Sequence, residues 1–332
     1  MAPKIITIIG SLNTDLVTVT PRVPSGGETL TGTSFSTGPG GKGANQAVAC
    51  VRLSRPNPST NPQKYEEDVT IKMKGAVGAD EFGPVLVLGM KSDGIDTSAV
   101  RMIKGQTTGV AVILVEESTG ENRILLNPGA NHSLQPQDFT TEASLGLPKP
   151  DLIILQLEIP LETVLQILET AKKADVDVLL NPAPAIALPA AVFEDLAHLI
   201  VNESEAAILT GRQVQDVEVP GFNWNTITQE FLQKGVKNVV ITLGAKGAFF
   251  ASKGDEKGTF VAAEKVKRVV DTTAAGDTFV GAYAVGVVRK SGGLQKGKVC
   301  EEDVKLACRA AGRTVEKQGA QSAIPWADEV DR

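Results

Sequence analysis

The chain has 332 residues, 42% of them hydrophobic and 22% charged, and a formal net charge of −6 at pH 7. This composition is typical of a globular protein with one large or two medium domains. The acidic balance argues against nucleic-acid binding, and no apolar run approaches the 18 residues of a membrane span. Three cysteines without a CxxC motif and two distant histidines, His132 and His198, argue against zinc and Ser-His-Asp sites. They favour reduced thiols and a cytoplasmic, or else nuclear, protein.

The first element that we predict is a buried strand, Ile5–Ile9, because a run of five residues is too short for a signal-peptide core. Gly10-Ser-Leu-Asn13-Thr-Asp15 follows it directly. In an extended chain Asn13 and Asp15 point the same way, and an amide beside a carboxylate suits the diol of a sugar. Taken alone, the motif favours ordinary turn chemistry.

Two stretches show no helical pattern. Leu16–Gly38 alternates Val, Thr and Ser around prolines and glycines, and Thr107–Pro128 holds the strand patterns Val110–Val115 and Asn122–Leu126. The segment Glu116–Gly120 between these two patterns is a hairpin signal. We predict that residues 16–38 and 107–128 form one small β-sheet, a lid, on an α/β core made of residues 1–15, 39–106 and 129–332.

A glycine loop, Gly38-Pro-Gly-Gly-Lys-Gly43-Ala-Asn45, opens the predicted helix Gly43–Leu53. It matches GxGxxG, but the residues before it are small and polar, and no acidic residue follows at the spacing of a dinucleotide site. It is not a P-loop either, because a glycine rather than Ser or Thr follows Lys42. Its backbone N–H groups, Lys42 and Asn45 can bind a small polyol, although a plain loop-to-helix turn explains the same residues.

Strand and helix patterns alternate along the rest of the chain, after a Pro-rich stretch, Arg55–Asp68, that we read as an exposed insertion. This alternation predicts an α/β fold, a doubly wound and mostly parallel sheet sandwiched by helices, with ligands at the carboxyl ends of its strands. The predicted strands are Val69–Gly75, Leu152–Leu157, Val178–Leu180, Leu199–Val201, Val239–Leu243 and Ala248–Ala251. The predicted helices are Leu161–Ala174, Glu203–Thr210, Asn225–Gln233, Gly276–Arg289 and Glu301–Glu316.

Polar residues follow three of these strands. Glu158 ends an apolar strand, at a ligand-facing or solvated position. Asn202-Glu-Ser-Glu205 either holds Mg²⁺ through water or caps the helix that follows. Thr242-Leu-Gly-Ala-Lys-Gly247 suits a phosphate-binding turn, a hairpin, or both at once.

The strongest local signal is Asp271-Thr-Thr-Ala-Ala-Gly-Asp277-Thr-Phe, which leads into a helix. Small residues at Ala274, Ala275 and Gly276 let an anion approach the free N–H groups of the helix N-terminus. Asp277 then lies beside the anion, and a base next to an anion cradle is what phosphoryl transfer to an alcohol requires. The shorter motif alone fits an ordinary N-cap, whereas the whole nonapeptide favours the site.

Together these motifs resemble the phosphofructokinase-B-type sugar kinases, from Gly10–Asp15 to Gly319–Trp326, which is nearly the whole chain. Gly40–Ala47 and Asp271–Phe279 are similar to the two signatures of that family, in order and in separation. Asn181–Pro184 resembles a segment of its ribose-phosphorylating members. The resemblance implies ATP-dependent phosphorylation of D-ribose at its 5-hydroxyl, Mg²⁺ as cofactor, K⁺ as activating ion, and a homodimer formed through the lids.

The resemblance also implies roles for individual residues. Asp277 would be the base, and Ala275 and Gly276 part of the anion hole. The implied sugar site is Asn13, Asp15, Gly41, Lys42, Asn45, Glu158 and Asp277. The implied ATP site is Asn202, Thr242, Gly244, Ala245, Lys246, Gly247, Gly276 and Cys308. The implied K⁺ site is Asp271, Thr273, Thr314, Lys317, Gly319 and Ala323, with Ala323 where many relatives carry a hydroxyl, and Glu205 would hold Mg²⁺ through water.

Other functions stay open at this point. A kinase of the same family can act on another small alcohol, such as 2-deoxyribose, fructose or a nucleoside. A non-catalytic sugar sensor on the same fold is a second alternative, although the intact Asp277 and glycine loop argue against it. A dehydrogenase, suggested only by GxGxxG, is a third.

Overall fold

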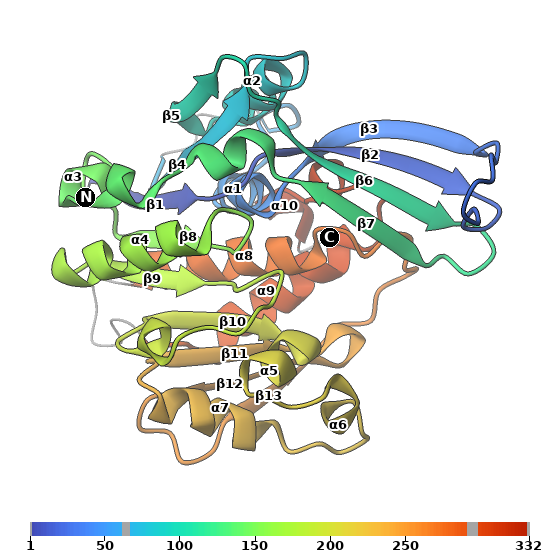
Figure 1. The fold of residues 1–332 in the computed structure, drawn as a ribbon. Helices are drawn as coiled ribbons and strands as arrows, with labels where there is room; N and C mark the ends of the chain where they lie inside the picture. The colour runs from blue at the N-terminus through green and yellow to red at the C-terminus, as the bar shows by residue number, and fades with distance from the viewer. Residues whose placement is uncertain (1, 62–66, 291–297, 331–332) are drawn as a thin grey trace.

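A nine-stranded sheet forms the centre of the molecule (Figure 1), in a computed structural model that describes residues 2–61, 67–290 and 298–330. Its order is β5-β4-β1-β8-β9-β10-β11-β12-β13; the first seven strands run parallel, and β12 and β13 are antiparallel. The strands are β1 (Lys4–Ile9), β4 (Val69–Gly78), β5 (Asp96–Ile103), β8 (Leu152–Leu155), β9 (Asp177–Leu180), β10 (His198–Asn202), β11 (Asn238–Thr242), β12 (Gly247–Ser252) and β13 (Thr259–Ala262). The predicted doubly wound, mostly parallel sheet is confirmed.

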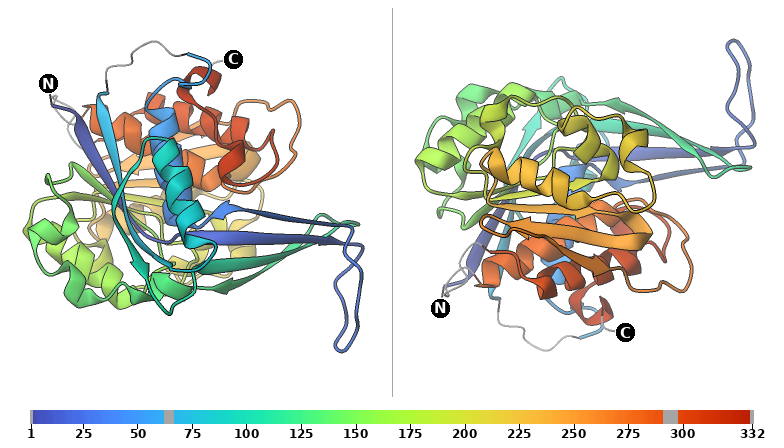
Figure 2. Two further views of the ribbon diagram at one scale, coloured as in Figure 1. Left: turned by 90° about the horizontal axis from the view of Figure 1, so that it is seen from above. Right: turned by 90° about the horizontal axis from the view of Figure 1, so that it is seen from below.

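Helices cover both faces of this sheet (Figure 2). One face packs against α1 (Lys42–Leu53), α2 (Gly83–Ser92), α8 (Ala275–Lys290) and α9 (Glu301–Thr314). The other face packs against α4 (Leu161–Lys173), α5 (Glu203–Leu209) and α7 (Trp224–Gln233). Three further helices are single turns, namely α3 (Glu142–Leu145), α6 (Val214–Val217) and α10 (Ala327–Val330). In β8, Leu152 and Ile154 enter the first core while Ile153 and Leu155 enter the second. Two covered faces explain why this strand is apolar at every position.

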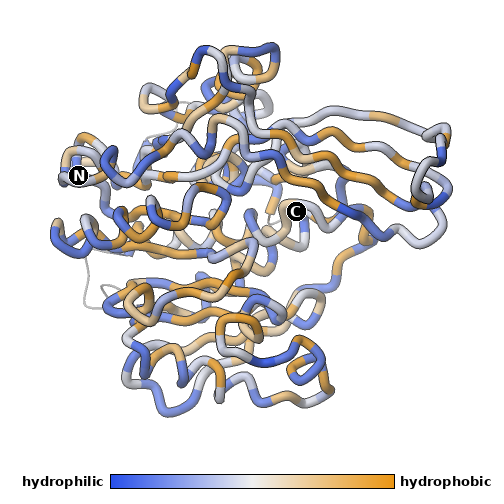
Figure 3. Tube along the Cα trace, viewed as in Figure 1, coloured by the Kyte–Doolittle hydropathy of each residue, from blue (hydrophilic) through white to orange (hydrophobic). Residues whose placement is uncertain are grey.

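A second, four-stranded sheet extends away from the core (Figure 1). Its order is β3-β2-β6-β7, formed by β2 (Asn13–Thr20), β3 (Ser34–Gly40), β6 (Gly109–Glu116) and β7 (Asn122–Asn127). The prediction that the two helix-free stretches join in one small sheet is confirmed. Figure 3 shows hydrophobic residues along its strands, and the side chains of Phe35, Ile124 and Leu125 are more than half exposed.

The sequence did not reveal the segment between β4 and the second sheet, where the structure has α2 and β5. Helix α2 buries only Gly83, Leu86 and Met90, and it exposes Val85 and Leu88, so its apolar pattern is weak. Strand β13 was also missed, and β8 ends at Leu155, two residues earlier than predicted. The predicted insertion 55–68 falls partly on residues 62–66, which lie outside the described residues.

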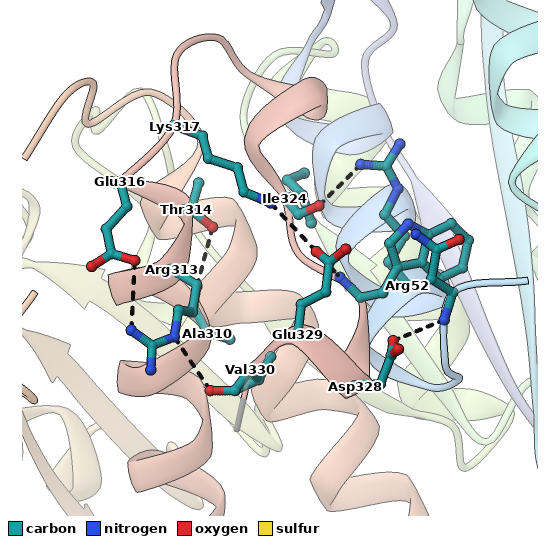
Figure 4. A network of polar contacts seen from close by, with 12 residues as sticks. Arg52, Ala310, Arg313, Thr314, Glu316, Lys317, Ile324, Asp328, Glu329 and Val330 are labelled. Atoms are coloured by element: carbon teal, nitrogen blue, oxygen red, sulfur yellow. Dashed lines mark hydrogen bonds and ion pairs between the residues drawn. The ribbon is translucent and has the colours of Figure 1, made fainter. Parts of the chain in front are cut away.

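The packing of α1 places the site residues that it carries. A Cβ on Gly281 of α8 would lie 2.4 Å from the Cβ of Ala49 in α1, so these two helices cross at backbone contact. At the far end of α1, the Arg52 guanidinium pairs with Asp93 at 2.8 Å. It also donates to the Ile324 carbonyl at 3.0 Å, as Figure 4 shows. These contacts fix α1 against both α8 and the C-terminal segment. No helix in the described ranges is both long and apolar enough to cross a membrane.

Candidate active site

The polar motifs that follow β1 and β8 meet at the carboxyl edge of the sheet. β1 and β8 are neighbours, and the chain continues from them toward opposite edges, which makes this the switch point where doubly wound folds bind ligands. One oxygen of Glu158, Oε2, accepts hydrogen bonds from Ser11 Oγ at 2.5 Å, Asn13 Nδ2 at 3.3 Å and the Lys42 backbone N–H at 3.1 Å. Glu158 therefore joins three segments of the predicted sugar site.

Two glycines let the glycine loop lie directly on the segment after β1. Gly41 has φ of 88°, and a Cβ there would lie 2.6 Å from the backbone nitrogen of Asn13. A Cβ on Gly43 would lie 2.6 Å from the backbone nitrogen of Ser11. Any side chain at either position would push the two segments apart, so packing requires both glycines, and conformation additionally favours glycine at position 41.

Asp277 lies buried in the first turn of α8, where two amides of α1 reach it. Asn45 Nδ2 donates to Asp277 Oδ2 at 3.0 Å, and Gln46 Nε2 donates to Asp277 Oδ1 at 2.9 Å. Ala274, directly before the helix, has φ of 59°, and a Cβ on Gly276 would meet no atom within 4 Å. The helix N-terminus thus has open space beside a carboxylate, which suits an anion next to a base.

Charges of opposite sign are concentrated here. Burial, together with the negative charges of the nearby Glu158 and Asp277, raises the pKa of Asp15 to about 7. Burial opposes the charge of Lys42, but the carboxylates of Asp277, Glu158 and Glu205 outweigh it and raise the pKa of the lysine. One partly buried ammonium group therefore lies among several acids, a polar cluster suited to a polyhydroxylated ligand.

The predicted nucleotide residues lie at the ends of two adjacent strands. Asn202 of β10 is paired in register with Thr242 of β11. Asn202 and Glu205 cap α5 reciprocally, with N···O distances of 2.8 and 2.9 Å, so the predicted cap is confirmed. The turn η4 (Gly244–Lys246) then leads into β12, which confirms the hairpin.

Two contacts of this region concern the side chains of Lys246 and Cys308. Lys246 forms an ion pair with Glu203 at 2.6 Å, which ties the η4 turn to α5. Ala245 lies in the same turn. Burial raises the pKa of the Cys308 thiol in α9 to about 11, so Cys308 stays neutral and offers a packing surface rather than a nucleophile.

The residues expected to hold K⁺ come from the loop before α8 and from the end of α9 with the segment that follows it, and Asp271 links these two parts. Its Oδ1 accepts from the N–H and the hydroxyl of Thr273 at 2.9 and 2.6 Å, and its Oδ2 accepts from the Gly319 N–H at 2.9 Å. The side chain of Lys317 turns away to Glu329, at 3.4 Å (Figure 4), and Ala323 is buried. Across the described ranges no three His, Cys, Asp or Glu gather as a metal cluster. The ligand type that these contacts place here is the carboxylate of Asp271, and oxygen ligands fit a hard cation.

The structure adds site residues to which the sequence assigned no role. Ser11 and Gln46 lie inside the quoted motifs, so the signal was present without a role. Asn181 accepts from Gln46 Nε2 at 3.1 Å, and it too lies in a quoted segment. Asn131, which donates to Asn13 Oδ1 at 2.8 Å, had no signal, because it lies in a short 3₁₀ turn 118 residues from its partner.

Comparison with known proteins identifies the class of protein to which this fold belongs. The family model of the pfkB family carbohydrate kinases matches residues 4–327. The ribokinase of Schizosaccharomyces pombe is 44% identical over 329 residues, which cover 98% of this chain and 96% of that protein. The deoxyribokinase of Salmonella typhi is 36% identical, covering 96% and 95%. The chain belongs to the pfkB family of carbohydrate kinases, and it is a phosphotransferase that resembles ribokinases over its whole length.

A solved structure gives the same result. The ribokinase of Arabidopsis thaliana, determined in complex with ribose and ATP, superposes with a TM-score of 0.80 at 28% identity. The match covers 99% of this chain and 98% of that one.

Proposed function

We propose that this chain transfers the γ-phosphoryl group of ATP to the 5-hydroxyl of D-ribose, giving D-ribose 5-phosphate and ADP. The similarity to ribokinases, one of them solved with ribose and ATP, supports this assignment. The observation that carries it is the position of Asp277, a buried carboxylate in the first turn of α8, between the open helix N-terminus and the polar cluster around Glu158.

In this proposal Asp277 accepts the proton of the ribose hydroxyl as that oxygen attacks the γ-phosphorus. A positioned general base contributes about 10²–10⁴-fold to such a step. The amides at Ala275 and Gly276 stabilise the charge that develops on the transferring group. The sugar is held by Asn13, Asp15, Gly41, Lys42, Asn45 and Glu158, which the second sheet covers as a lid, residues 16–38 and 107–128.

ATP would lie along Asn202, Thr242, the η4 turn, Gly247 and Cys308. Mg²⁺, held through water by Glu205, would neutralise charge on the phosphates. K⁺ would bind at Asp271, Thr273, Thr314, Lys317, Gly319 and Ala323, and its charge would stabilise the loop before the anion hole. The three free cysteines are consistent with the expected cytoplasmic location.

A second candidate substrate is 2-deoxyribose, because one relative at 36% identity is a deoxyribokinase. The two sugars differ by one hydroxyl. A site built to hydrogen-bond that hydroxyl would strongly reject the sugar that lacks it.

The first prediction tests the function and the base together. With Mg²⁺, and with or without K⁺, we expect ADP release on D-ribose, faster with K⁺ and much slower on fructose or adenosine. Asp277→Asn should bind ribose and ATP but lose about 10²–10⁴-fold in kcat, because the base is absent. The measurements are coupled ADP detection and calorimetric ribose binding.

The matched control is Asp195→Asn, a surface acid paired with Lys172 just before β10, at the opposite edge of the sheet. It should keep full activity. A kcat near the wild-type value in Asp277→Asn would refute the assigned base. A wild-type kcat/KM that is higher for 2-deoxyribose than for D-ribose would make 2-deoxyribose the preferred substrate.

A further inference from the structure

Two chains of buried side-chain amides converge on the carboxylate of Asp277. Gln156 Nε2 donates to Gln46 Oε1 at 2.6 Å, and Gln46 Nε2 donates to Asp277 Oδ1 at 2.9 Å. On the other side, Gln321 Nε2 donates to Asn45 Oδ1 at 3.2 Å, and Asn45 Nδ2 donates to Asp277 Oδ2 at 3.0 Å. Each carboxylate oxygen therefore has its own donor, and each donor is oriented by another amide.

The chain that runs through Gln46 is enclosed by the protein, so a ligand cannot contact it directly. The Gln46 side chain is fully buried, and its Nε2 also donates to Asn181 Oδ1, whose own amide donates to the Ile200 carbonyl at 3.0 Å. Gln156 is equally enclosed, since a Cβ on Gly10 would lie 2.0 Å from its Oε1. Gln46 is thus held on three sides and has no accessible surface for a sugar.

The chemistry of the base gives this asymmetry a meaning. A carboxylate that takes a proton does so on one oxygen, and the other oxygen remains an acceptor. The bond from Gln46 to Oδ1 is compatible with both protonation states. The bond from Asn45 to Oδ2 leaves that oxygen a second lone pair for the proton, and Asn45, which belongs to the proposed sugar site, keeps some exposure where Gln46 has none.

We propose that Gln46, locked by Gln156, is a positioning residue that fixes Oδ1 of Asp277 and leaves Oδ2 as the oxygen that accepts the proton from the substrate alcohol. This inference rests on the proposed function. It assigns no substrate contact to Gln46, which acts only through Asp277.

The test is a double-mutant cycle on the full chain. Gln46→Met keeps the length of the side chain but removes the donor. We expect kcat to fall about 10–100-fold, as misorientation of a reacting group does, while KM for ribose and for ATP changes less than about threefold. In the Asp277→Asn background the same substitution should cost less than about twofold, because no base is left to orient. A general structural defect would lower kcat by the same factor in both backgrounds.

Two further variants keep the test decisive. Gln46→Glu still accepts from Gln156 but places a negative charge against Asp277, so its kcat should be at least as low as that of Gln46→Met. If Gln46→Met does not fold, the same double-mutant cycle is measured with Gln156→Met, which removes the donor to Gln46 instead of the donor to Asp277. The expected loss in kcat is then about 3–10-fold.

The outcomes separate this inference from the proposed function. Unchanged kcat in Gln46→Met, a raised KM for ribose at constant kcat, or equal losses in both backgrounds would overturn the positioning role while Asp277→Asn stays inactive. Retained activity of Asp277→Asn itself would instead overturn the function on which the inference rests.

Discussion

At the scale of single residues, burial lowers the pKa of Lys42, but the nearby carboxylates of Asp277, Glu158 and Glu205 outweigh it, so the pKa of the lysine is raised. Asp15 has the most perturbed carboxyl group of the site, with its pKa raised to about 7 mainly by burial. Between about pH 4 and 7 the folded protein keeps a proton on Asp15 that the unfolded chain has lost. An ionised Asp15 therefore costs folding free energy, and a sugar diol that donates to it offsets this cost.

We expect Asp15→Asn to raise the free energy of unfolding at pH 8, because it removes a buried charge. The sign follows from linkage: between about pH 4 and 7 the folded state binds more protons than the unfolded state, so Asp15 lowers stability as pH rises. The gain should reach a few kcal/mol at pH 8, on the order of the free energy of a three-unit shift, and shrink toward pH 4.

Urea unfolding of wild type and variant at pH 5 and pH 8 measures this difference, and calorimetry should show weaker ribose binding by the variant. A gain that is equal at both pH values would contradict a titrating Asp15.

At the scale of elements, the crossing of α1 and α8 sets the geometry of the base. Gly281 lies one turn after Asp277, and Ala49 lies one turn after Asn45. The backbone contact between Gly281 and Ala49 therefore brings the amides of α1 within hydrogen-bond reach of the carboxylate of α8.

Gly281→Ala should separate the two helices, because its Cβ would lie 2.8 Å from backbone atoms of Ala49 and Cys50. We expect a loss of about 1–3 kcal/mol in stability and about tenfold or more in kcat, since the amides no longer meet Asp277. Thermal melts and ADP release measure the two effects.

The matched control is Gly89→Ala in α2, where a new Cβ would meet no atom within 4 Å. It should stabilise the protein by up to about 1 kcal/mol through helix propensity and leave kcat unchanged. Similar effects of the two substitutions would show that the helix crossing does not tune the site.

At the scale of the whole molecule, the second sheet is uncovered on both faces at its edge. Consecutive residues of a strand face opposite sides, yet Ile124, Leu125 and Leu126 of β7 are 57%, 64% and 39% exposed. An exposed apolar edge strand favours association. We propose that it pairs with the second sheet of another copy, so that two lids cover two sugar sites.

We expect light scattering after size exclusion to give a particle of two chains. Ile124→Asp and Leu125→Asp, one on each face of β7, should give single chains with a raised KM for ribose, because the lid loses its cover. The control Leu147→Asp, at a position 70% exposed but outside the second sheet, should remain a dimer. Wild type running as one chain at micromolar concentration would contradict the pairing.

Local patterns were sufficient to predict the main strands and helices, the second sheet and the glycine loop that opens α1. Buried strands, glycine turns and helix N-termini can be recognised from about ten or twenty consecutive residues, because the local backbone geometry determines which residue types fit there. The sequence patterns of helix α2 and of the edge strand β5 are weaker, because each element buries few apolar side chains.

The arrangement of the site was decided only by the tertiary structure. Gln46 and Asp277 are 231 residues apart, and Ser11 and Glu158 are 147 apart, so no local pattern encodes their contacts. Motif matching placed Asp277 and Glu158 in one site but could not show which amides hold them. Only the packing of α1 on α8, and of β1 beside β8, brings those groups together, because hydrogen bonds depend on distance in space and not on separation in sequence.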